Sequence, residues 1–316
     1  MKFKAEDKDR IAYAVLHKGG AHRDDFLCAA FVAALYDAPI TRRDAVELDL
    51  GAEVCLVLDT GQRFEPENNN FDHHQDDPRV SDECALSLWS RYVNFVDEET
   101  GERFNLHDVF APFLWFDMTR DIDANGPFQV AKNLGISPDT LFGLSGPIER
   151  ALLSMFSEQS YISPAGDSFY GALYDIGLEI LSFAVRAKRG VENLVQVETQ
   201  VVVYCADDDS NMNFDIYETS DIAGLSMLRR GREDEGGVTA CHDDRGPGWA
   251  LLRQDDDPRV DFAKCADDDR VLFAHPKGFI LKTKERCSTT DLEDLVTMAC
   301  VEDDSPEDEA LSSETA

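Results

Sequence analysis

Two adjacent histidines follow an aspartate in FDHHQ, residues 71–75, in a chain with 7 histidines among 316 residues. Neighbouring side chains in a strand point to opposite faces, so both imidazoles can serve one site only if the chain turns there. A carboxylate beside two imidazoles is a pattern of metal or phosphate sites. The triplet Asp72, His73 and His74 is therefore a candidate functional site, provided that other segments supply partners.

Three other segments carry the imidazoles and carboxylates that a metal site needs. They are His17, His22 and Asp24 in HKGGAHRDD, Asp59 at the end of VCLVLD, and Asp121 with Asp123 in DIDANG. Such ligands without a thiolate suit Mn²⁺ better than a structural zinc ion. Two ions about 3.5–4 Å apart need a bridging carboxylate, and Asp59 is the natural bridge because it ends a strand between the other groups. We expect two Mn²⁺ ions, with Mg²⁺ as the alternative.

The elements around these groups follow an α/β pattern. Apolar runs predict buried strands over 11–16 and 53–61, and helices are expected over 25–36, 82–96, 104–120, 147–160 and 167–188. Strands that alternate with helices are typical of α/β domains, and ligands of such domains gather at the carboxyl ends of the strands. His17, Asp59 and the 72–74 triplet occupy positions of that kind.

The composition changes near residue 190. The segment 194–206 is strand-like, and short apolar runs separated by acidic clusters follow it, with a helix expected over 291–299. We therefore expect a catalytic domain over residues 1–190 and a smaller α+β domain over 191–300. The acidic, polar segment 301–316 is expected to be a disordered tail.

Acidic residues dominate the charge: 63 Asp and Glu against 30 Lys and Arg give a formal net charge of −33. Such a surface repels nucleic-acid phosphate at long range and argues against a non-specific duplex binder. It favours a short anionic substrate or a locally neutralised cleft. A high-salt cytoplasm is an alternative cause of the acidity.

The N-terminus, MKFKAEDKDR, has no apolar signal region, and no stretch approaches the roughly 18 apolar residues of a membrane span. We expect a cytoplasmic protein with no membrane partner. A homo-oligomer is a further possibility. The eight cysteines form no C-x-x-C pair, which favours reduced, mostly buried thiols over a disulfide or zinc framework.

Four motifs resemble the Myg-type exonuclease family in order and spacing: HKGGAHRDDFLCAAFVAAL, VLDTGQRFEPENNNFDHHQ, DIDANG and LFAHPKGFI. That family is a branch of the DHH phosphoesterases, with RecJ-like nucleases and manganese-dependent pyrophosphatases. The resemblance implies a Rossmann-like DHH domain with a mainly parallel sheet, and a second domain that closes over a cleft. It also implies two Mn²⁺ or Mg²⁺ ions and hydrolysis of a phosphoester, in relatives by a 3′→5′ RNA exonuclease.

The resemblance also implies a role for each matching residue. One metal would be held by His17, His22 and Asp59, and the other by Asp24, Asp59, His73 and Asp121. His74 would face the phosphate, and Asp72 would orient His73 through the ring N–H of that histidine. The fourth motif departs from the family pattern, because Ala124 replaces its usual acid and Asp123 is shifted by one; Asp121 is the better match and Asp123 the alternative.

A second departure lies near the C-terminus, where the family's segment rich in glycine and histidine reads GFILKTKE. The substrate contacts implied there are His275, Lys282 and Lys284, since lysines can hold phosphate as point charges.

The motifs and the resemblance together predict an exonuclease or phosphodiesterase that acts on single-stranded RNA or short oligonucleotides. The alternatives are a phosphoesterase for a cyclic dinucleotide, a phosphorylated nucleotide or pyrophosphate, and a metal-binding regulatory protein without turnover.

Overall fold

A six-stranded sheet forms the centre of the N-terminal unit, Met1–Val185. In spatial order its strands are β5 (Phe64–Glu65), β6 (Asn70–Phe71), β4 (Cys55–Leu58), β2 (Tyr13–Leu16), β3 (Ile40–Arg42) and β9 (Tyr161–Ile162). The inner strands β6, β4, β2 and β3 are parallel, whereas β5 and β9 pair antiparallel at the edges. The expected mainly parallel sheet is therefore corrected to a mixed one. A short turn joins β5 to β6, and a connection that short permits only a hairpin.

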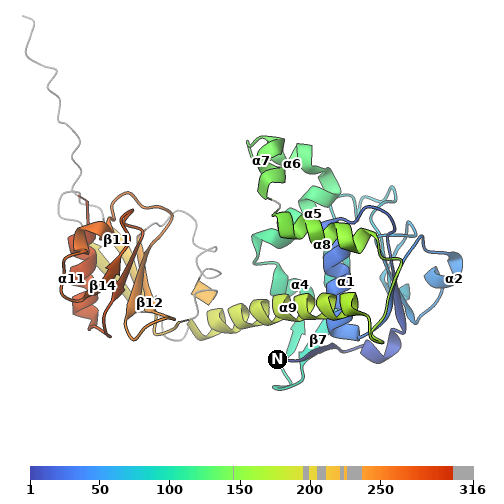
Figure 1. Cartoon of the computed structure of the whole chain (residues 1–316), viewed down its shortest axis with the longest axis horizontal. Helices are drawn as coiled ribbons and strands as arrows, with labels where there is room; N and C mark the ends of the chain where they lie inside the picture. Colours follow the sequence, from blue (N-terminus) through green and yellow to red (C-terminus); the bar gives the residue numbers. More distant parts are fainter. Residues whose placement is uncertain (145, 195–198, 205–210, 221–223, 226–236, 302–316) are drawn as a thin grey trace, which may run out of the picture. The chain divides into compact units, whose positions relative to one another are not determined.

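The computed structural model describes residues 1–144, 146–194, 199–204, 211–220, 224–225 and 237–301 (Figure 1). The chain divides into the units Met1–Val185 and Arg186–Ala316, and the boundary expected at residue 190 falls within helix α9 (Ser168–Leu194). The closure of a second domain over a cleft stays a prediction. Of the expected tail, only Val301 lies within the described residues.

Helix α1 (Arg23–Tyr36) follows β2 and is buried from Asp24 to Tyr36. Leu16 and Leu58 of the sheet pack in the same core cluster as the apolar residues of this helix. On the opposite face of the sheet, Val15 and Val57 pack with Leu50 of α2 (Glu47–Leu50). Successive side chains of the central strands point to opposite faces, and both faces are covered. The sequences of these strands are therefore continuous apolar runs.

Helix α9 crosses α1 at close range (Figure 1). A Cβ atom added at Gly177 of α9 would lie 2.2 Å from the backbone oxygen of Ala30 in α1. Only glycine permits this approach, which presses α9 onto the helix that carries part of the candidate site.

The remaining helices of this unit are α3 (Ala85–Ser90), α4 (Leu106–Phe110), α5 (Leu114–Asn125), α6 (Pro127–Asn133), α7 (Pro138–Leu144) and α8 (Pro147–Ser157). The helix expected over 82–96 ends at Ser90, because Asn94–Asp97 forms β7 between β1 (Phe3–Ala5) and β8 (Arg103–Asn105). The single helix expected over 104–120 is two helices, α4 and α5.

The C-terminal unit contains a second mixed sheet, in the order β10 (Thr199–Tyr204), β11 (Asn211–Ile216), β12 (Val238–His242), β13 (Trp249–Arg253), β15 (Ile280–Thr283) and β14 (Val271–Ala274). Among the strands of this unit that the structure describes, β11 and β12 pair in parallel and the other neighbours pair antiparallel. Helix α11 (Thr289–Ala299) buries Leu292, Leu295 and Val296 in the core of this unit.

Among the described residues, Ser168–Glu192 of α9 is long and apolar enough to count as a membrane-span candidate by length and composition. No such stretch was expected from the sequence. Leu173, Leu181 and Val185 of this helix lie in the core cluster of the N-terminal unit, and a core helix passes the same test.

Candidate metal centre

The carboxyl ends of three neighbouring parallel strands carry the first part of the site. His17 follows β2, Asp59 follows β4, and Asp72 follows β6, and these strands are adjacent in the sheet. Asp59 has a φ of 57°, in the left-handed region that non-glycine residues seldom adopt. Strain of this kind is retained where the surroundings fix a functional side chain.

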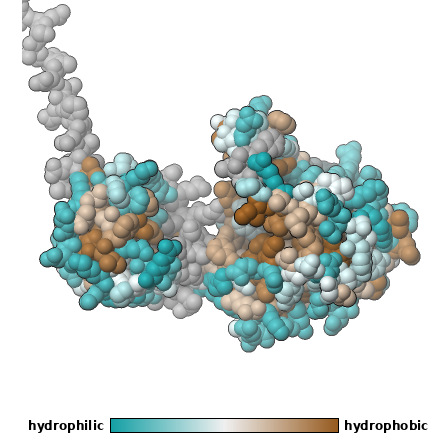
Figure 2. Space-filling view, viewed as in Figure 1, coloured by the Kyte–Doolittle hydropathy of each residue, from teal (hydrophilic) through white to brown (hydrophobic). Residues whose placement is uncertain are grey.

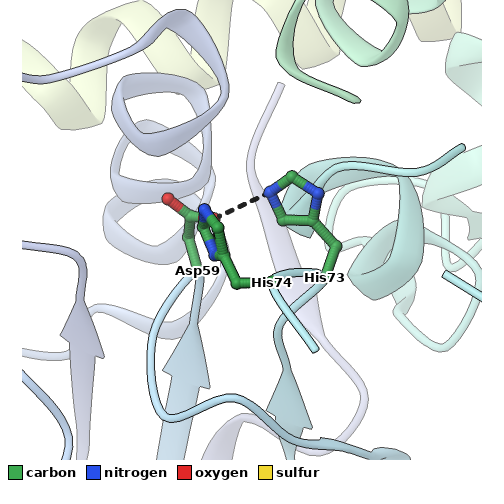
Figure 3. A group of neighbouring side chains, drawn as sticks. All are labelled: Asp59, His73 and His74. Carbon is green, nitrogen blue, oxygen red and sulfur yellow. Dashed lines mark ion pairs between the residues drawn. The ribbon is translucent and has the colours of Figure 1, made fainter. Parts of the chain in front are cut away.

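Asp59 lies beside both histidines of the triplet (Figure 3). An oxygen of its buried carboxylate is 3.3 Å from Nε2 of His73 and 3.6 Å from Nδ1 of His74. The His73 side chain is nearly buried, whereas half of the His74 side chain is exposed. The two imidazoles therefore meet the same carboxylate, and only His74 is widely open to solvent.

Helix α5 adds Asp123 to the same cluster. Its carboxylate lies 3.0 Å from Nε2 of His73 and 3.1 Å from Nδ1 of His22. Asp121, which matched the family motif better, instead pairs with Arg120 at 2.8 Å and lines a separate pocket with Asp82 and Glu83. The geometry therefore favours Asp123 over Asp121 as the contribution of the fourth motif.

The N-terminus of α1 brings two aspartates to the cluster. Asp24 and Asp25 are both fully buried. Asp25 caps the helix, because one of its oxygens accepts a hydrogen bond from the backbone N–H of His22 at 3.1 Å. The same oxygen lies 3.9 Å from Nδ1 of His17. Asp25 was not among the expected metal ligands, so its place in the cluster was missed.

Asp72 contacts His74, whereas the resemblance implied that it orients His73. Its Oδ1 lies 2.7 Å from Nδ1 of His74 and also accepts the backbone N–H of that residue. Its Oδ2 accepts the backbone N–H of Gln62 at 2.6 Å. Asp72 thus holds the exposed imidazole in place, and Asp59 and Asp123 hold the buried one.

Two contacts tie the loop of His17 and His22 to the C-terminal end of α8. The buried guanidinium of Arg42 donates to the backbone oxygens of Phe156, at 2.8 Å, and Gly19, at 3.2 Å. The hydroxyl of Ser157 accepts the backbone N–H of Ala21 at 2.8 Å. The loop is therefore positioned by side chains that lie outside the cluster.

Both carboxylate oxygens of Asp24 and Oδ1 of Asp25 are buried without a hydrogen bond. Four further buried atoms of the cluster lie 3.0–3.9 Å from an oppositely charged neighbour but make no hydrogen bond of good geometry, namely Nδ1 of His17, Oδ1 of Asp59, Nε2 of His73 and Oδ2 of Asp123. An unpaired buried carboxylate is costly, and such groups normally pair with a cation. Four groups of three residues bring their ligand atoms within 4.8 Å of one another, namely Asp59 with His73 and His74, His17 with Asp25 and Asp59, His22 with Asp24 and Asp25, and Asp24 with Asp59 and Asp123. The cluster therefore fits divalent cations.

The crowding of carboxylates is also visible in their protonation. Burial raises the pKa of Asp59 to about 6, and the neighbouring Asp24 and Asp123 add to that rise. Burial raises the pKa of Asp24 and of Asp25 as well, and each has a further carboxylate beside it. Such shifts arise where negative charge is concentrated without compensation.

The histidines respond in the opposite direction to the same charges. Burial lowers the pKa of His73, but its contacts with Asp123 and Asp59 outweigh this and raise the pKa to about 10. The contact with Asp123 raises the pKa of His22 to about 9. The contact with Asp72 raises the pKa of His74. The imidazoles partly neutralise the acidic cluster.

The residues of the C-terminal unit that were expected to contact the substrate interact with other residues of that unit. The ammonium of Lys282 lies 2.5 Å from a carboxylate oxygen of the buried Asp243, and that of Lys284 donates to the backbone oxygen of Asp269 at 2.6 Å. The His275 ring packs on Phe279, with ring centroids 4.1 Å apart. Their role as substrate contacts stays a prediction.

Residues 14–88 match the model of the family described as MYG1_exonuc, uncharacterised protein family (UPF0160). This confirms the resemblance over the segment that contains His17, His22, Asp24, Asp59 and the triplet. A match to a family named for an exonuclease supports a phosphoesterase activity. The matched segment ends before Asp123 and before the C-terminal unit.

Two solved structures are similar at a low level. A DHH domain from a member of the s1p family of ribosomal proteins has 13% identity and a TM-score of 0.29, over 92% of this chain and 86% of that chain. A pGpG-specific phosphodiesterase from Vibrio cholerae has 13% identity and a TM-score of 0.26, over 90% of this chain and 97% of that chain. No curated protein matches.

Proposed function

We propose that this chain is a two-metal phosphoesterase that releases nucleotides from single-stranded RNA or short oligonucleotides in the 3′→5′ direction. The observation that supports this most strongly is one cluster of buried carboxylate and imidazole atoms that come from four separate segments and make no hydrogen bond of good geometry. The match of residues 14–88 to an exonuclease-named family supports the same reaction class.

The residues that would hold the two ions follow from these groups. Asp59 belongs to three of the four, so it would be the carboxylate shared by both ions. His17 and Asp25 complete one site with it, and Asp24, His73 and Asp123 complete the other. His22, which lies at the edge of both, contacts Asp123 and has a largely exposed side chain. Imidazole and carboxylate donors favour Mn²⁺, with Mg²⁺ as the alternative.

When bound, a pair of such ions supplies Lewis acidity and lowers the pKa of a water molecule, which removes the need for a protein nucleophile. The protein positions the ligands and the phosphate. His74 is half exposed, and Asp72 fixes its Nδ1, so its Nε2 is available to donate to a phosphate oxygen. A fixed donor beside the phosphate stabilises charge that develops on its oxygens.

The acidic composition argues for short substrates. With a formal net charge of −33, a long polyanion is repelled over much of its length, whereas a dinucleotide meets mainly the cluster. We therefore expect higher rates on dinucleotides than on long RNA, and equal rates on both would contradict this expectation.

A release assay with labelled oligonucleotides, dinucleotides and pyrophosphate in Mn²⁺ tests the proposal. Asp59→Ala should abolish activity, while Asp108→Ala, which alters an exposed aspartate of α4, should leave it unchanged. Activity that survives Asp59→Ala contradicts the two-metal mechanism. Turnover of pyrophosphate alone favours the small-substrate alternative, and no turnover on any phosphoester favours the regulatory one.

A further inference from the structure

A pocket of about 450 Å³ adjoins the metal cluster within the N-terminal unit. Its charged lining consists of the cluster residues His22, Asp24 and Asp123 and of the ion pair between Arg23 and Glu149. The rest of the wall is mainly apolar and includes Ile122, Leu141 and Leu153. Its volume lies at the lower end of the range of small-molecule sites, roughly 300–1,000 Å³. The pocket therefore combines charged groups of the cluster with an apolar wall that suits a compact apolar group.

Helix α5 supplies both kinds of wall. Asp123 belongs to the cluster, and Ile122 and Thr119 line the same pocket. The hydroxyl of Thr119 donates to the backbone oxygen of Trp115 at 2.7 Å, so this polar group is already satisfied within the helix. Helix α5 thus fixes the distance between the cluster and the apolar wall, because one rigid element carries both.

A second pocket, of about 690 Å³, lies on the other side of the ion pair between Arg23 and Glu149. Ile148 of α8 and Phe183 of α9 line it and are exposed. Hydrophobic residues gather on the visible face of the N-terminal unit (Figure 2). Arg23, Glu149 and Leu153 line both pockets, but none of the cluster residues lines this larger one. Of these two pockets, the smaller one is therefore placed to hold part of a molecule whose phosphate lies at the cluster.

We propose that the smaller pocket binds the nucleobase of the nucleotide whose phosphate lies at the metal cluster, an inference that rests on the proposed function. A base is flat, largely apolar on its faces and attached to a phosphate through one sugar. Contact with the faces of a base tolerates every base, because recognition by hydrogen bonds to its edges is not required. The pocket accordingly selects nucleotide esters over phosphoesters without a base and discriminates weakly among the four bases.

The test compares Ile122→Ala with Ile180→Ala. Both remove the same atoms from partly buried isoleucines, but Ile180 lines only the larger pocket. The substrates are a dinucleotide and two versions that carry an abasic sugar at one position or the other, with Mn²⁺ present. Thermal unfolding and Mn²⁺ binding are measured for each variant, so that a folding defect is recognised.

Ile122→Ala should lower kcat/KM about tenfold on the dinucleotide, a typical effect of lost apolar contacts in a pocket. It should change kcat/KM less than about twofold on the abasic substrate that lacks the bound base. Ile180→Ala should change neither. Equal losses on all three substrates, or no loss on the dinucleotide, would overturn the inference while leaving the phosphoesterase proposal intact.

Binding of adenosine 5′-monophosphate, measured by calorimetry with Mn²⁺, gives a readout that needs no turnover. Its dissociation constant should rise about tenfold in Ile122→Ala and stay the same in Ile180→Ala. If the wild type hydrolyses no phosphoester, the proposed function fails, and this binding comparison still decides the pocket. Unchanged binding in Ile122→Ala, or no binding at all, then overturns the inference.

Discussion

The carboxylate of Asp123, on helix α5, lies 3.0 Å from Nε2 of His73, which follows strand β6. This contact joins the helical layer of the N-terminal unit to the carboxyl edge of its sheet. It also places Asp123 opposite Asp59, which approaches the same nitrogen at 3.3 Å. A buried imidazole between two carboxylates is the core of the candidate metal centre.

Asp123→Ala should weaken Mn²⁺ binding at least about 100-fold, since even residues that only orient metal ligands contribute about 10–100-fold. Asp121→Ala is the matched control, because it removes an aspartate of the same helix that pairs with Arg120. Calorimetric titration with Mn²⁺ measures both. A large loss in Asp121→Ala and none in Asp123→Ala would restore the assignment from the family motif.

Asp72→Asn should lower kcat about 10–100-fold and change Mn²⁺ affinity less than about threefold. The reason is that Asp72 holds His74, at 2.7 Å, whereas Asp59 and Asp123 contact His73. Steady-state kinetics and Mn²⁺ titration separate the two effects. Weakened metal binding with an unchanged kcat would show that Asp72 acts through His73.

Gly177→Ala should destabilise the N-terminal unit by about 1–3 kcal/mol, because the added Cβ would lie 2.2 Å from the backbone oxygen of Ala30. Gly171→Ala in the same helix has open space around the added Cβ. There the better helix propensity of alanine should stabilise by roughly 0.5–1 kcal/mol. Urea unfolding measures both, and a stabilising Gly177→Ala would contradict the close packing of α9 on α1.

Asp49 lies outside the candidate metal centre, and its ion pair should make the stability of the protein depend on pH. Its contact with Arg43, at 2.6 and 2.7 Å, lowers the pKa of this buried carboxyl to about 2, against the opposing effect of burial. The pKa of Asp49 is lower in the folded than in the unfolded state. Its contribution to the free energy of unfolding is therefore complete above about pH 4 and is lost as the pH falls toward 2. It amounts to roughly 1–2 kcal/mol.

The measurement is urea unfolding of the wild type and Asp49→Asn at pH 6 and pH 3. The difference in unfolding free energy between the two proteins should shrink at pH 3, because Asp49 of the unfolded wild type takes up a proton there while the folded carboxylate stays mainly ionised. Other carboxylates affect both proteins alike. A difference that stays constant or grows at pH 3 would contradict the Asp49–Arg43 pairing.

The part of the site at the sheet edge was predictable from local sequence. Strands β2 and β4 appear as short apolar runs, and a polar residue follows each, His17 and Asp59. Parallel strands bring their carboxyl ends to one edge, so the convergence of His17 and Asp59 was predictable. Strand β6, which places the 72–74 triplet beside them, was not predicted.

The part contributed by helices was harder to predict. Thr119, Ile122 and Asp123 share one face of α5, because residues three and four apart are neighbours on a helix, and Thr119 is buried. Asp121 lies off that face. Helical phase could therefore have identified Asp123, but motif spacing favoured Asp121. The prediction of a helix over 82–96 was wrong at its C-terminal end, because Asn94–Asp97 pairs with strands from other parts of the sequence. Tertiary pairing of this kind overrides local propensity.

The central claim is that the cluster around Asp59 holds two divalent cations, and anomalous X-ray diffraction from Mn²⁺-soaked crystals tests it most directly. We expect two manganese peaks, one beside His17 and Asp25 and one beside Asp24, His73 and Asp123, with Asp59 contacting both. Crystals of Asp59→Ala should lack this pair. No manganese at the cluster in the wild type, or peaks only elsewhere, would contradict the account.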